Sequence, residues 1–600
     1  MNRYNIFFVS LLTLVLFSQS FAQARISRTW EVLKYDLNVT LPQNFTADRD
    51  LDVKAKLDIK NVSQRAYSRV TLRISDQATV SAVQVNNAEA DYRKGQEGIG
   101  GGKNLQRIIV SVPSISPGTS LSISVSYKMK VASNSGLNAL SPIGSQFLPT
   151  SYWYPTPNSW FFAAGSDSAP YKLTLNSIGS LSAVSAGTNS GNTFDQKLNG
   201  QPFFTLGGWQ KVESKGVSVL SPKGPGKFNQ SRASELADLA SEAKTFIAGL
   251  FGNTSSYPLT IVAVSRGAGF SNGGTIFVDE SVFRREKLDS QTAISVIDGV
   301  AKIYLGSVFK TEGDGYGAIR EGLSRYVATQ FLEKKYGKDI ADLERLRQRT
   351  NYSAVANRDA PLYFVSPLDG YYYNVSANKG AMIWKFLERS AGAGFYSTIA
   401  GLATDGILNL DEVRTAFAAE KDYLDYMLEK TTEMNLMAGV PQKKGGQTIV
   451  ALRNVSEVVA SVDVVGTTST GQKLSTRVSI PANGYGQAVF NTAATVVSAE
   501  IDAEKVYPQT NYLDDIAPRE IDENDPILFI KREFDRQRFA DAEKNARKVL
   551  KLYPKFDDAQ TFLARSLLAQ SKITEAQRIY QSILASKLPT ARSLAWSNVG

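Results

Sequence analysis

The first third of the chain alternates between apolar and polar residues. Apolar side chains occupy every second position from Leu51 to Ile59, and again from Leu121 to Val131. A period of two is typical of antiparallel strands that bury one face and expose the other. We therefore predict an N-terminal antiparallel β-sandwich over residues 25–212.

The spacing of apolar residues changes near residue 230. Leu236, Leu239, Ala243 and Ile247 follow helical spacing, and Gly252 is suited to end that helix. Further helical patterns lie near residues 290–309, 319–336, 376–391 and 410–435. These patterns predict a mostly helical domain over residues 213–440.

Strand patterns return near residue 440, and helices follow them. Lys443-Lys444-Gly445-Gly446 reads as a linker, and short strand patterns beyond it predict a small β-sandwich over 441–518. In the helical tail, Phe539-Ala540-Asp541-Ala542 recurs 34 positions later as Ile573-Thr574-Glu575-Ala576. This period resembles the tetratricopeptide repeat, so residues 519–600 are predicted to form such repeats.

Tetratricopeptide helices stack into concave surfaces that hold a peptide or helix. A third unit would begin at Pro589. The tail carries basic residues that predict a slightly positive rim, although solvated helix faces look the same: Lys544, Arg547, Lys548 and Lys551. The tail is therefore one predicted site for a peptide or protein partner.

The amino terminus has the features of an export signal. Arg3 precedes an apolar run from Ile6 to Phe17, and Ala22-Gln23-Ala24 forms a cleavage site. We predict a signal peptide over residues 1–24, a periplasmic or extracellular protein, and no transmembrane segment after cleavage. An uncleaved anchor is the alternative, although the run is short for a spanning helix.

Composition excludes several kinds of chemistry. The 600 residues contain no Cys and no His, which excludes disulfides, Ser-His-Asp triads and imidazole or thiolate metal ligands. There are 67 basic and 57 acidic residues, for a net charge of +10. The excess is not concentrated in a basic block, so we expect no nucleic-acid partner.

Four motifs in the helical domain resemble those of the gluzincin aminopeptidases, peptidase family M1. Residues 294–306 (ISVIDGVAKIYLG) resemble the family's V-I-A-H-E-L-A-H-Q-W-F-G, and residues 320–326 (REGLSRY) resemble N-E-G-F-A-S-Y. Residues 266–271 lie where the family has G-A-M-E-N, and residues 379–381 lie where it has Y-E-K-G-A. With the surrounding patterns, the resemblance implies a multidomain α+β fold: an N-terminal antiparallel β-sandwich, a thermolysin-like mostly helical domain, a small β-sandwich and a C-terminal helical repeat.

In that family two histidines and a glutamate hold zinc. The resemblance puts Asp298 and Lys302 at the histidine positions and Glu321 at the glutamate, 19 positions after Lys302. A lysine brings a positive charge to the place of the cation, and two carboxylates without nitrogen ligands make a poor zinc site. We therefore expect no metal and no cofactor, although the family itself uses zinc.

The family's other functional positions are also replaced. The resemblance puts Gly299 at the glutamate that activates water and Phe270 at the glutamate that binds the substrate's α-amine. Ala377 stands at the tyrosine that stabilises the intermediate, and Tyr373 is close but out of step. We therefore predict no catalytic residue.

The replacements have a physical interpretation. Asp298 and Lys302 are one helical turn apart in the favourable order, acid first. We predict that the Lys302 ammonium stands where the metal stood and bridges Asp298 and Glu321. The alternative is an exposed helix pair that contributes only about 0.3–0.5 kcal/mol.

Ligand contacts are predicted at the former substrate site. In the family the 266–271 segment is a strand edge that pairs with peptide backbone, a role that needs no particular side chains; an ordinary loop is the alternative. Arg320 and Arg325 flank Glu321 and are placed to grip a carboxylate, unless they are solvated helix residues. The predicted ligand-binding residues are Gly267, Ala268, Gly269, Phe270, Arg320 and Glu321.

Together these features predict an exported, non-catalytic aminopeptidase-like protein that acts as a peptide- or protein-binding or scaffolding module. Its partner would bind the old cleft, the C-terminal repeats, or both. The alternative function is a divergent M1-family metallopeptidase with weak or non-zinc activity. A structural envelope-assembly protein is the third.

Overall fold

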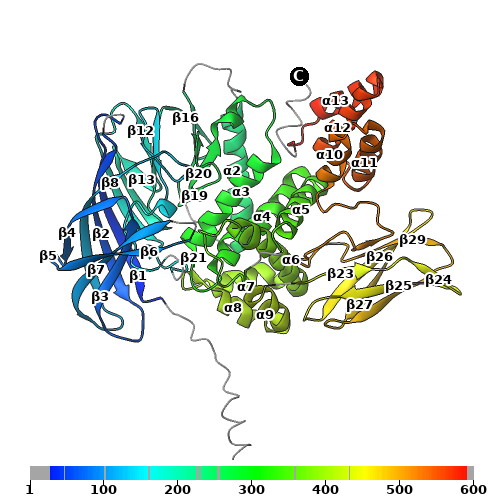
Figure 1. The fold of residues 1–600 in the computed structure, drawn as a ribbon, viewed down its shortest axis with the longest axis horizontal. Helices are drawn as coiled ribbons and strands as arrows, with labels where there is room; N and C mark the ends of the chain where they lie inside the picture. Colours follow the sequence, from blue (N-terminus) through cyan, green and yellow to red (C-terminus); the bar gives the residue numbers. More distant parts are fainter. Residues whose placement is uncertain are drawn as a thin grey trace, which may run out of the picture.

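The computed structural model describes residues 28–590, except for 46–47, 101–102, 160–162, 224–228, 230, 253–256, 357–359 and 432. The predicted signal peptide and residues 591–600 of the third repeat lie outside this described part. Figure 1 shows an N-terminal β domain, a helical middle, a small β domain and a C-terminal helical tail. The predicted mixed α+β fold class is confirmed.

The N-terminal domain is built from alternating buried and exposed side chains, as in β2 and β8. Its largest sheet has the order β13-β14-β11-β1-β2-β8-β4-β5, and the β3-β7-β6 sheet shares its apolar core. Most pairings are antiparallel, but β1 runs parallel to β11. The strands are β1 (Trp30–Thr40), β2 (Asp50–Asn61), β3 (Tyr67–Ser75), β4 (Ala78–Val85), β5 (Ala88–Glu89), β6 (Tyr92–Gly98), β7 (Asn104–Ile115), β8 (Ser120–Lys130), β9 (Asn138–Ala139), β10 (Gly144–Phe147), β11 (Ala169–Asn176), β12 (Ser182–Val184), β13 (Thr188–Ser190), β14 (Thr193–Gly200) and β15 (Phe204–Gly207), with the short helix η1 (Pro149–Ser151) after β10.

The middle domain places helices against the five-stranded sheet β16-β17-β18-β20-β19. Its first strand spans the predicted boundary at residue 212. The helix α2 ends at Gly252 in a left-handed conformation (φ 64°), as its sequence predicts. The elements are β16 (Trp209–Ser214), β17 (Val217–Pro222), α2 (Arg232–Phe251), β18 (Leu259–Val264), β19 (Ser271–Asn272), β20 (Thr275–Asp279), η2 (Glu280–Arg284), α3 (Ser290–Ile303), η3 (Tyr304–Val308), β21 (Lys310–Thr311), η4 (Ala318–Leu323), α4 (Ser324–Tyr336), α5 (Lys338–Ser353), η6 (Asn374–Lys379), α6 (Gly380–Ala391), η7 (Gly392–Gly394), α7 (Phe395–Leu402), β22 (Ile407–Leu408), α8 (Leu410–Ala416), η8 (Ala418–Glu420) and α9 (Lys421–Glu429).

The small β domain has two four-stranded sheets, β23-β25-β24 with β28 beside β25, and β27-β26-β29-β30. The predicted linker at 443–446 is wrong, because Lys443 and Lys444 belong to β24, and Gly445 and Gly446 form the turn of the β24–β25 hairpin, where Gly445 has a φ of 63°. The strands are β23 (Leu436–Ala438), β24 (Gln442–Lys444), β25 (Gln447–Asn454), β26 (Ala460–Thr468), β27 (Lys473–Ile480), β28 (Tyr485–Asn491), β29 (Val496–Ile501) and β30 (Ile516–Ala517).

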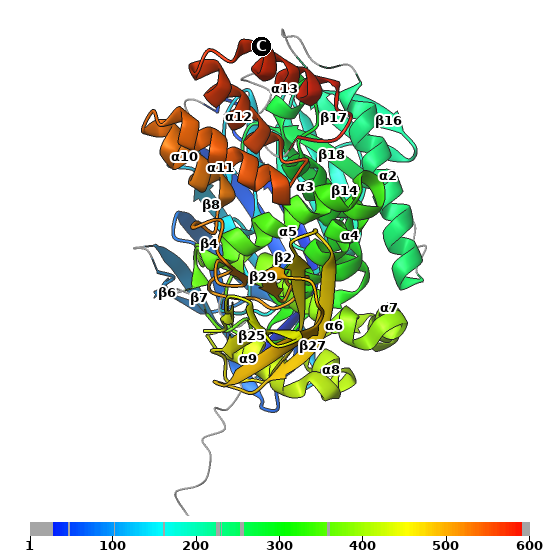
Figure 2. The same cartoon turned by 90° about the vertical axis from the view of Figure 1, so that its right-hand side faces the viewer.

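The tail consists of two helical hairpins, α10 (Pro526–Asp535) with α11 (Phe539–Leu552), and α12 (Asp557–Ala569) with α13 (Ile573–Ala585). It lies against the middle domain, as Figure 2 shows from the side. Thr590 forms a parallel β-bridge with Asp289, and the Ser290 amide donates a hydrogen bond to the Thr590 carbonyl oxygen at 2.7 Å. The end of the tail is therefore tied to the start of α3. In the described part of the chain, no helix is both long and apolar enough to cross a membrane.

Candidate functional site

Two helical segments carry the predicted site residues. Helix α3 begins at its cap Asp289, whose carboxylate accepts from the Thr292 amide, and it carries Asp298 and Lys302. The π-type segment η4 carries Glu321 and passes very close to α6. An added Cβ on Gly322 would lie 2.9 Å from Cα of Gly380, so this crossing requires both glycines.

The Lys302 ammonium lies between two carboxylates. Its Nζ is 2.7 Å from Asp298 Oδ2 and 2.5 Å from Glu321 Oε2. The three side chains are 8%, 7% and 1% exposed. The contact is therefore the buried bridge that the sequence predicts, and not an exposed helix pair.

Further charges extend the bridge on both sides. Arg320 Nη1 donates to Glu321 Oε1 at 2.7 Å, and its Nη2 donates to the Ser271 carbonyl at 3.3 Å. On the other side Arg325 Nε lies 3.6 Å from Asp298 Oδ1. Arg320 and Arg325 are thus structural partners of the bridge, 26% and 21% exposed, and not freely solvated helix residues.

The network continues to the helix α5. Arg325 Nη1 lies 3.4 Å from Glu344 Oε1, and Glu344 also pairs with Arg347. Arg347 in turn donates to the Ser290 hydroxyl at 3.2 Å, beside the point where the tail is tied to α3. Positive and negative side chains therefore alternate from the sheet edge to the tail.

The electrostatics keep the lysine charged. Burial alone would lower the pKa of Lys302, but Asp298 and Glu321 raise it above its usual value. Burial also opposes the charge of Arg320, yet Glu321 raises the pKa of that guanidinium. Lys302 and Arg320 therefore carry their positive charges at neutral pH.

Gly299, which the sequence resemblance aligns with a catalytic glutamate, has no free space for a side chain. A Cβ on Gly299 would lie 2.9 Å from Cδ1 and Cγ1 of Ile276, which extends from β20. Real Cβ atoms essentially never approach other atoms so closely. Ile276 therefore fills the space next to α3, and a glutamate there would require it to move.

The other predicted site residues are divided between the site and the core. Phe270 is partly buried, and it packs edge-to-face on Phe203 and Phe277 at centroid distances of 5.0 and 5.3 Å, so its ring lies against the apolar core of the N-terminal domain. Ala377 is buried in η6. Tyr373 does not align with the tyrosine of the sequence resemblance, but its ring centre lies 5.9 Å from Lys302 Nζ. Its side chain is 61% exposed.

The segment at the sheet edge offers little free backbone. Ala268 and Gly269 are exposed, but the Gly269 amide donates to the Phe277 carbonyl. Gly267 packs against the N-terminal domain, where an added Cβ would lie 2.7 Å from Gln146. At the end of the segment, the Ser271 carbonyl already accepts a hydrogen bond from Arg320. Within residues 266–271, exposed residues are therefore confined to Ala268 and Gly269.

The residues at this site do not fit a zinc ion. The side chains that face one another here are two carboxylates, Asp298 and Glu321, and the Lys302 ammonium occupies the space between them. Zinc in proteins is bound by imidazole, thiolate or carboxylate groups, and an ammonium repels it. Among the residues that the structure describes, no group of three acidic, His or Cys side chains is placed to hold a metal.

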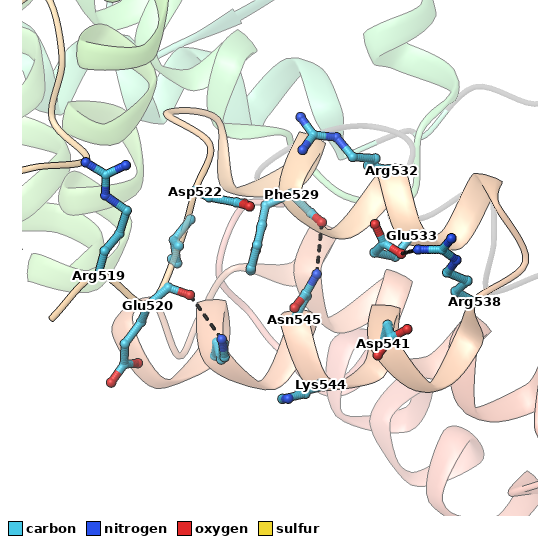
Figure 3. Close-up of a pocket in the computed structure, with 12 residues that line it drawn as sticks. Arg519, Glu520, Asp522, Phe529, Arg532, Glu533, Arg538, Asp541, Lys544 and Asn545 are labelled. Carbon is cyan, nitrogen blue, oxygen red and sulfur yellow. Dashed lines mark hydrogen bonds and ion pairs between the residues drawn. The ribbon is translucent and has the colours of Figure 1, made fainter.

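The tail contains a separate groove of about 440 Å³, where the linker 519–522 passes α10 and α11 (Figure 3). Asn545 Nδ2 donates to the Phe529 carbonyl at 3.2 Å, and Lys548 Nζ donates to the Glu520 carbonyl at 3.1 Å. Basic and acidic side chains both line the groove, so it has no strong preference for one charge.

The predicted basic rim is only partly available. Lys544 and Lys548 line the groove, whereas Arg547 Nη2 contacts Glu543 at 2.9 Å and Glu575 at 2.7 Å. Large apolar side chains are exposed on all four tail helices: Leu528, Leu552, Leu568, Ile573 and Leu584.

Comparison with known proteins supports the fold. The structure resembles Legionella pneumophila aminopeptidase A in complex with aspartic acid (TM-score 0.62, 14% identity, 94% of this chain and 67% of that chain). It also resembles an M1 zinc metallopeptidase from Deinococcus radiodurans (TM-score 0.50, 16% identity, 68% of this chain and 95% of that chain). The tetratricopeptide repeat family model matches residues 533–593. No curated protein sequence matches the chain.

These comparisons confirm the resemblance to the M1 aminopeptidase fold and the repeat in the tail. Sequence reasoning missed Glu344 and Arg347, because it did not predict the helix α5 that carries them. The signal was present, since Ile340, Leu343 and Leu346 follow helical spacing and are buried.

Proposed function

We propose that this protein is a non-catalytic, exported scaffold with the aminopeptidase fold, which binds a peptide or protein partner. The observation that carries the proposal is the buried Lys302 ammonium between Asp298 and Glu321. It supplies the positive charge that a metal would otherwise supply to these carboxylates. An ammonium neutralises carboxylates but does not generate a metal-bound nucleophile.

The second support is the packing of Gly299. Peptide hydrolysis needs a base beside the attacking water, and the family position for that base has no side chain and no free space. Restoring a metal alone would therefore leave the site without its base.

Assays of the purified protein test this proposal. Amino-acid amides and short peptides are offered with added zinc, with other divalent metals and with chelator. The expected result is no turnover above that of the Lys302→Met variant. Turnover that a chelator abolishes would instead favour the divergent metallopeptidase.

The tail is proposed as the main contact with the partner, because tetratricopeptide repeats commonly mediate protein interactions. Leu528 and Leu568 are 50% and 43% exposed on α10 and α12. Substituting each with Glu is expected to abolish partner capture. Ile143, which is 82% exposed in the N-terminal domain, provides the matched Ile143→Glu control. Equal loss in the control would argue against a role for the tail.

Export is part of the proposal and rests on the sequence of residues 1–24. Cell fractionation with amino-terminal sequencing tests it. A mature protein that begins at Arg25 is expected, and a cytoplasmic protein that retains residues 1–24 would contradict it.

A further inference from the structure

A small cavity lies where the helical domain meets the small β domain. Its volume is about 10 Å³, close to the space that one water molecule needs, about 10–15 Å³. It is lined by residues of α4, α5 and α6 and by one residue that follows β29: Tyr326, Thr329, Arg345, Gln348, Arg349, Ala381, Met382, Lys385 and Lys505. The cavity thus touches two domains.

The lining contains four cationic side chains and no acidic one. Arg345 pairs with Glu333 and, at 2.8 Å, with Asp342. Lys505 pairs with Asp515 at 2.6 Å and with Glu500 at 3.0 Å. These two cations are therefore neutralised from outside the cavity.

The other two cations have only neutral partners. Lys385 Nζ donates to the carbonyl of Glu504, and Arg349 Nη2 donates to the Tyr553 hydroxyl at 3.3 Å. In the described part of the chain, no carboxylate oxygen lies within 4.0 Å of either group. An ammonium has three donors and a guanidinium has five, so both keep N–H groups without a protein acceptor.

We infer that this cavity binds one small monovalent anion of the size of chloride. Two uncompensated cations that face a shared, water-sized space give a site for an anion, because each charge would otherwise stay partly desolvated without a counterion.

Charge repulsion at the site supports this assignment. Burial, Arg345 and Arg349 lower the pKa of the Lys385 ammonium to about 8, and Asp502 and Glu504 oppose this shift only in part. A bound anion favours the charged form of Lys385. Anion affinity is therefore expected to fall as the pH rises above 8.

The position of the cavity gives the anion a structural role. Lys385 belongs to α6, Lys505 follows the last long strand of the small β domain, and Arg349 reaches Tyr553 of the tail. A bound anion would hold cations from two domains together, beside the tail.

Chloride-35 NMR on the full chain tests the assignment. The probe is sodium chloride, and the expected result is a protein-dependent broadening of the chloride line that bromide reverses. Lys385→Met is expected to remove the broadening. Lys473→Met, at an exposed lysine of the small β domain, is the matched control and should retain the broadening.

Thermal denaturation gives an independent readout. The unfolding midpoint of the wild-type chain and of the Lys473→Met control is expected to be higher in sodium chloride than in sodium gluconate of equal ionic strength, with saturation. The difference should vanish in Lys385→Met or, if that variant does not fold, in Arg349→Met. Broadening that persists in both variants, or a midpoint that follows ionic strength alone, would overturn the assignment.

Discussion

Replacing Lys302 with methionine tests the bridge most fully. Methionine keeps an unbranched side chain, slightly shorter than that of lysine, and removes its charge. Asp298 and Glu321 would then remain as buried carboxylates that are 7% and 1% exposed. Removing one partner of a buried ion pair costs about 3–5 kcal/mol, because the other charge stays buried.

The neighbouring arginines determine where in this range the loss of stability should fall, because they still contact the two carboxylates. Glu321 keeps Arg320 at 2.7 Å, and Asp298 keeps the more distant Arg325 at 3.6 Å. We therefore expect the lower end, a loss of about 3 kcal/mol in the free energy of unfolding at pH 7.

The pH dependence provides a second signature. In the wild type the pKa of Lys302 is raised above 10.5, so its stabilisation is complete below that pH and is lost as the pH rises through the folded-state value. In the variant, one buried carboxylate is expected to bind a proton as the pH falls. The deficit relative to wild type should therefore shrink towards pH 5.

Urea denaturation followed by circular dichroism measures both signatures, with Lys473→Met as the control for the same substitution on the surface. A Lys302→Met variant as stable as the control at pH 7 would refute the buried bridge. A deficit that does not change between pH 5 and 8 would refute the proposed repulsion between the carboxylates.

Three further predictions concern packing and a buried acid. Gly299→Ala is expected to cost about 1–3 kcal/mol through contact with Ile276. Ile276→Ala removes every Ile276 atom that the added Cβ would meet, so in a double-mutant cycle the two losses should be less than additive; additive losses would contradict the contact. Gly322→Ala should cost about 3 kcal/mol, because its Cβ would meet the backbone of Gly380, and an unchanged melting temperature would contradict this. Burial raises the pKa of Asp167 from 3.8 to about 6, so the folded state binds the proton more tightly. Wild-type stability, relative to Asp167→Asn, should therefore fall by about 2 kcal/mol as the pH rises from 4 to 7, and parallel pH profiles of the two proteins would contradict this.

Periodicity predicted much of the fold because it reflects burial directly. Alternation in β2 and β8 and the helical spacing in α2 appear in the structure with nearly the expected bounds. The expected helix over 290–309 stops at Ile303, because Leu305 and Gly306 leave helical geometry. Apolar spacing does not reveal such a break.

The site was predictable only in part. Spacing along one helix brought Asp298 and Lys302 together, and the resemblance added Glu321. The contacts of Arg325 with Asp298 and Glu344 depend on how α3, α4 and α5 pack, which no local pattern specifies. The position of the Tyr373 ring near Lys302 likewise depends on η6, a π-helix that begins directly after Tyr373. A π-helix has more residues per turn than an α-helix, so regular helical spacing does not predict where this side chain lies.

The central claim is that an ammonium group fills the place of a metal. A crystal soaked in zinc and measured at the zinc absorption edge tests this directly. The account predicts no anomalous peak between Asp298 and Glu321, with Lys302 Nζ in contact with both carboxylates. A peak bound to Glu321, with the Lys302 side chain displaced, would contradict it.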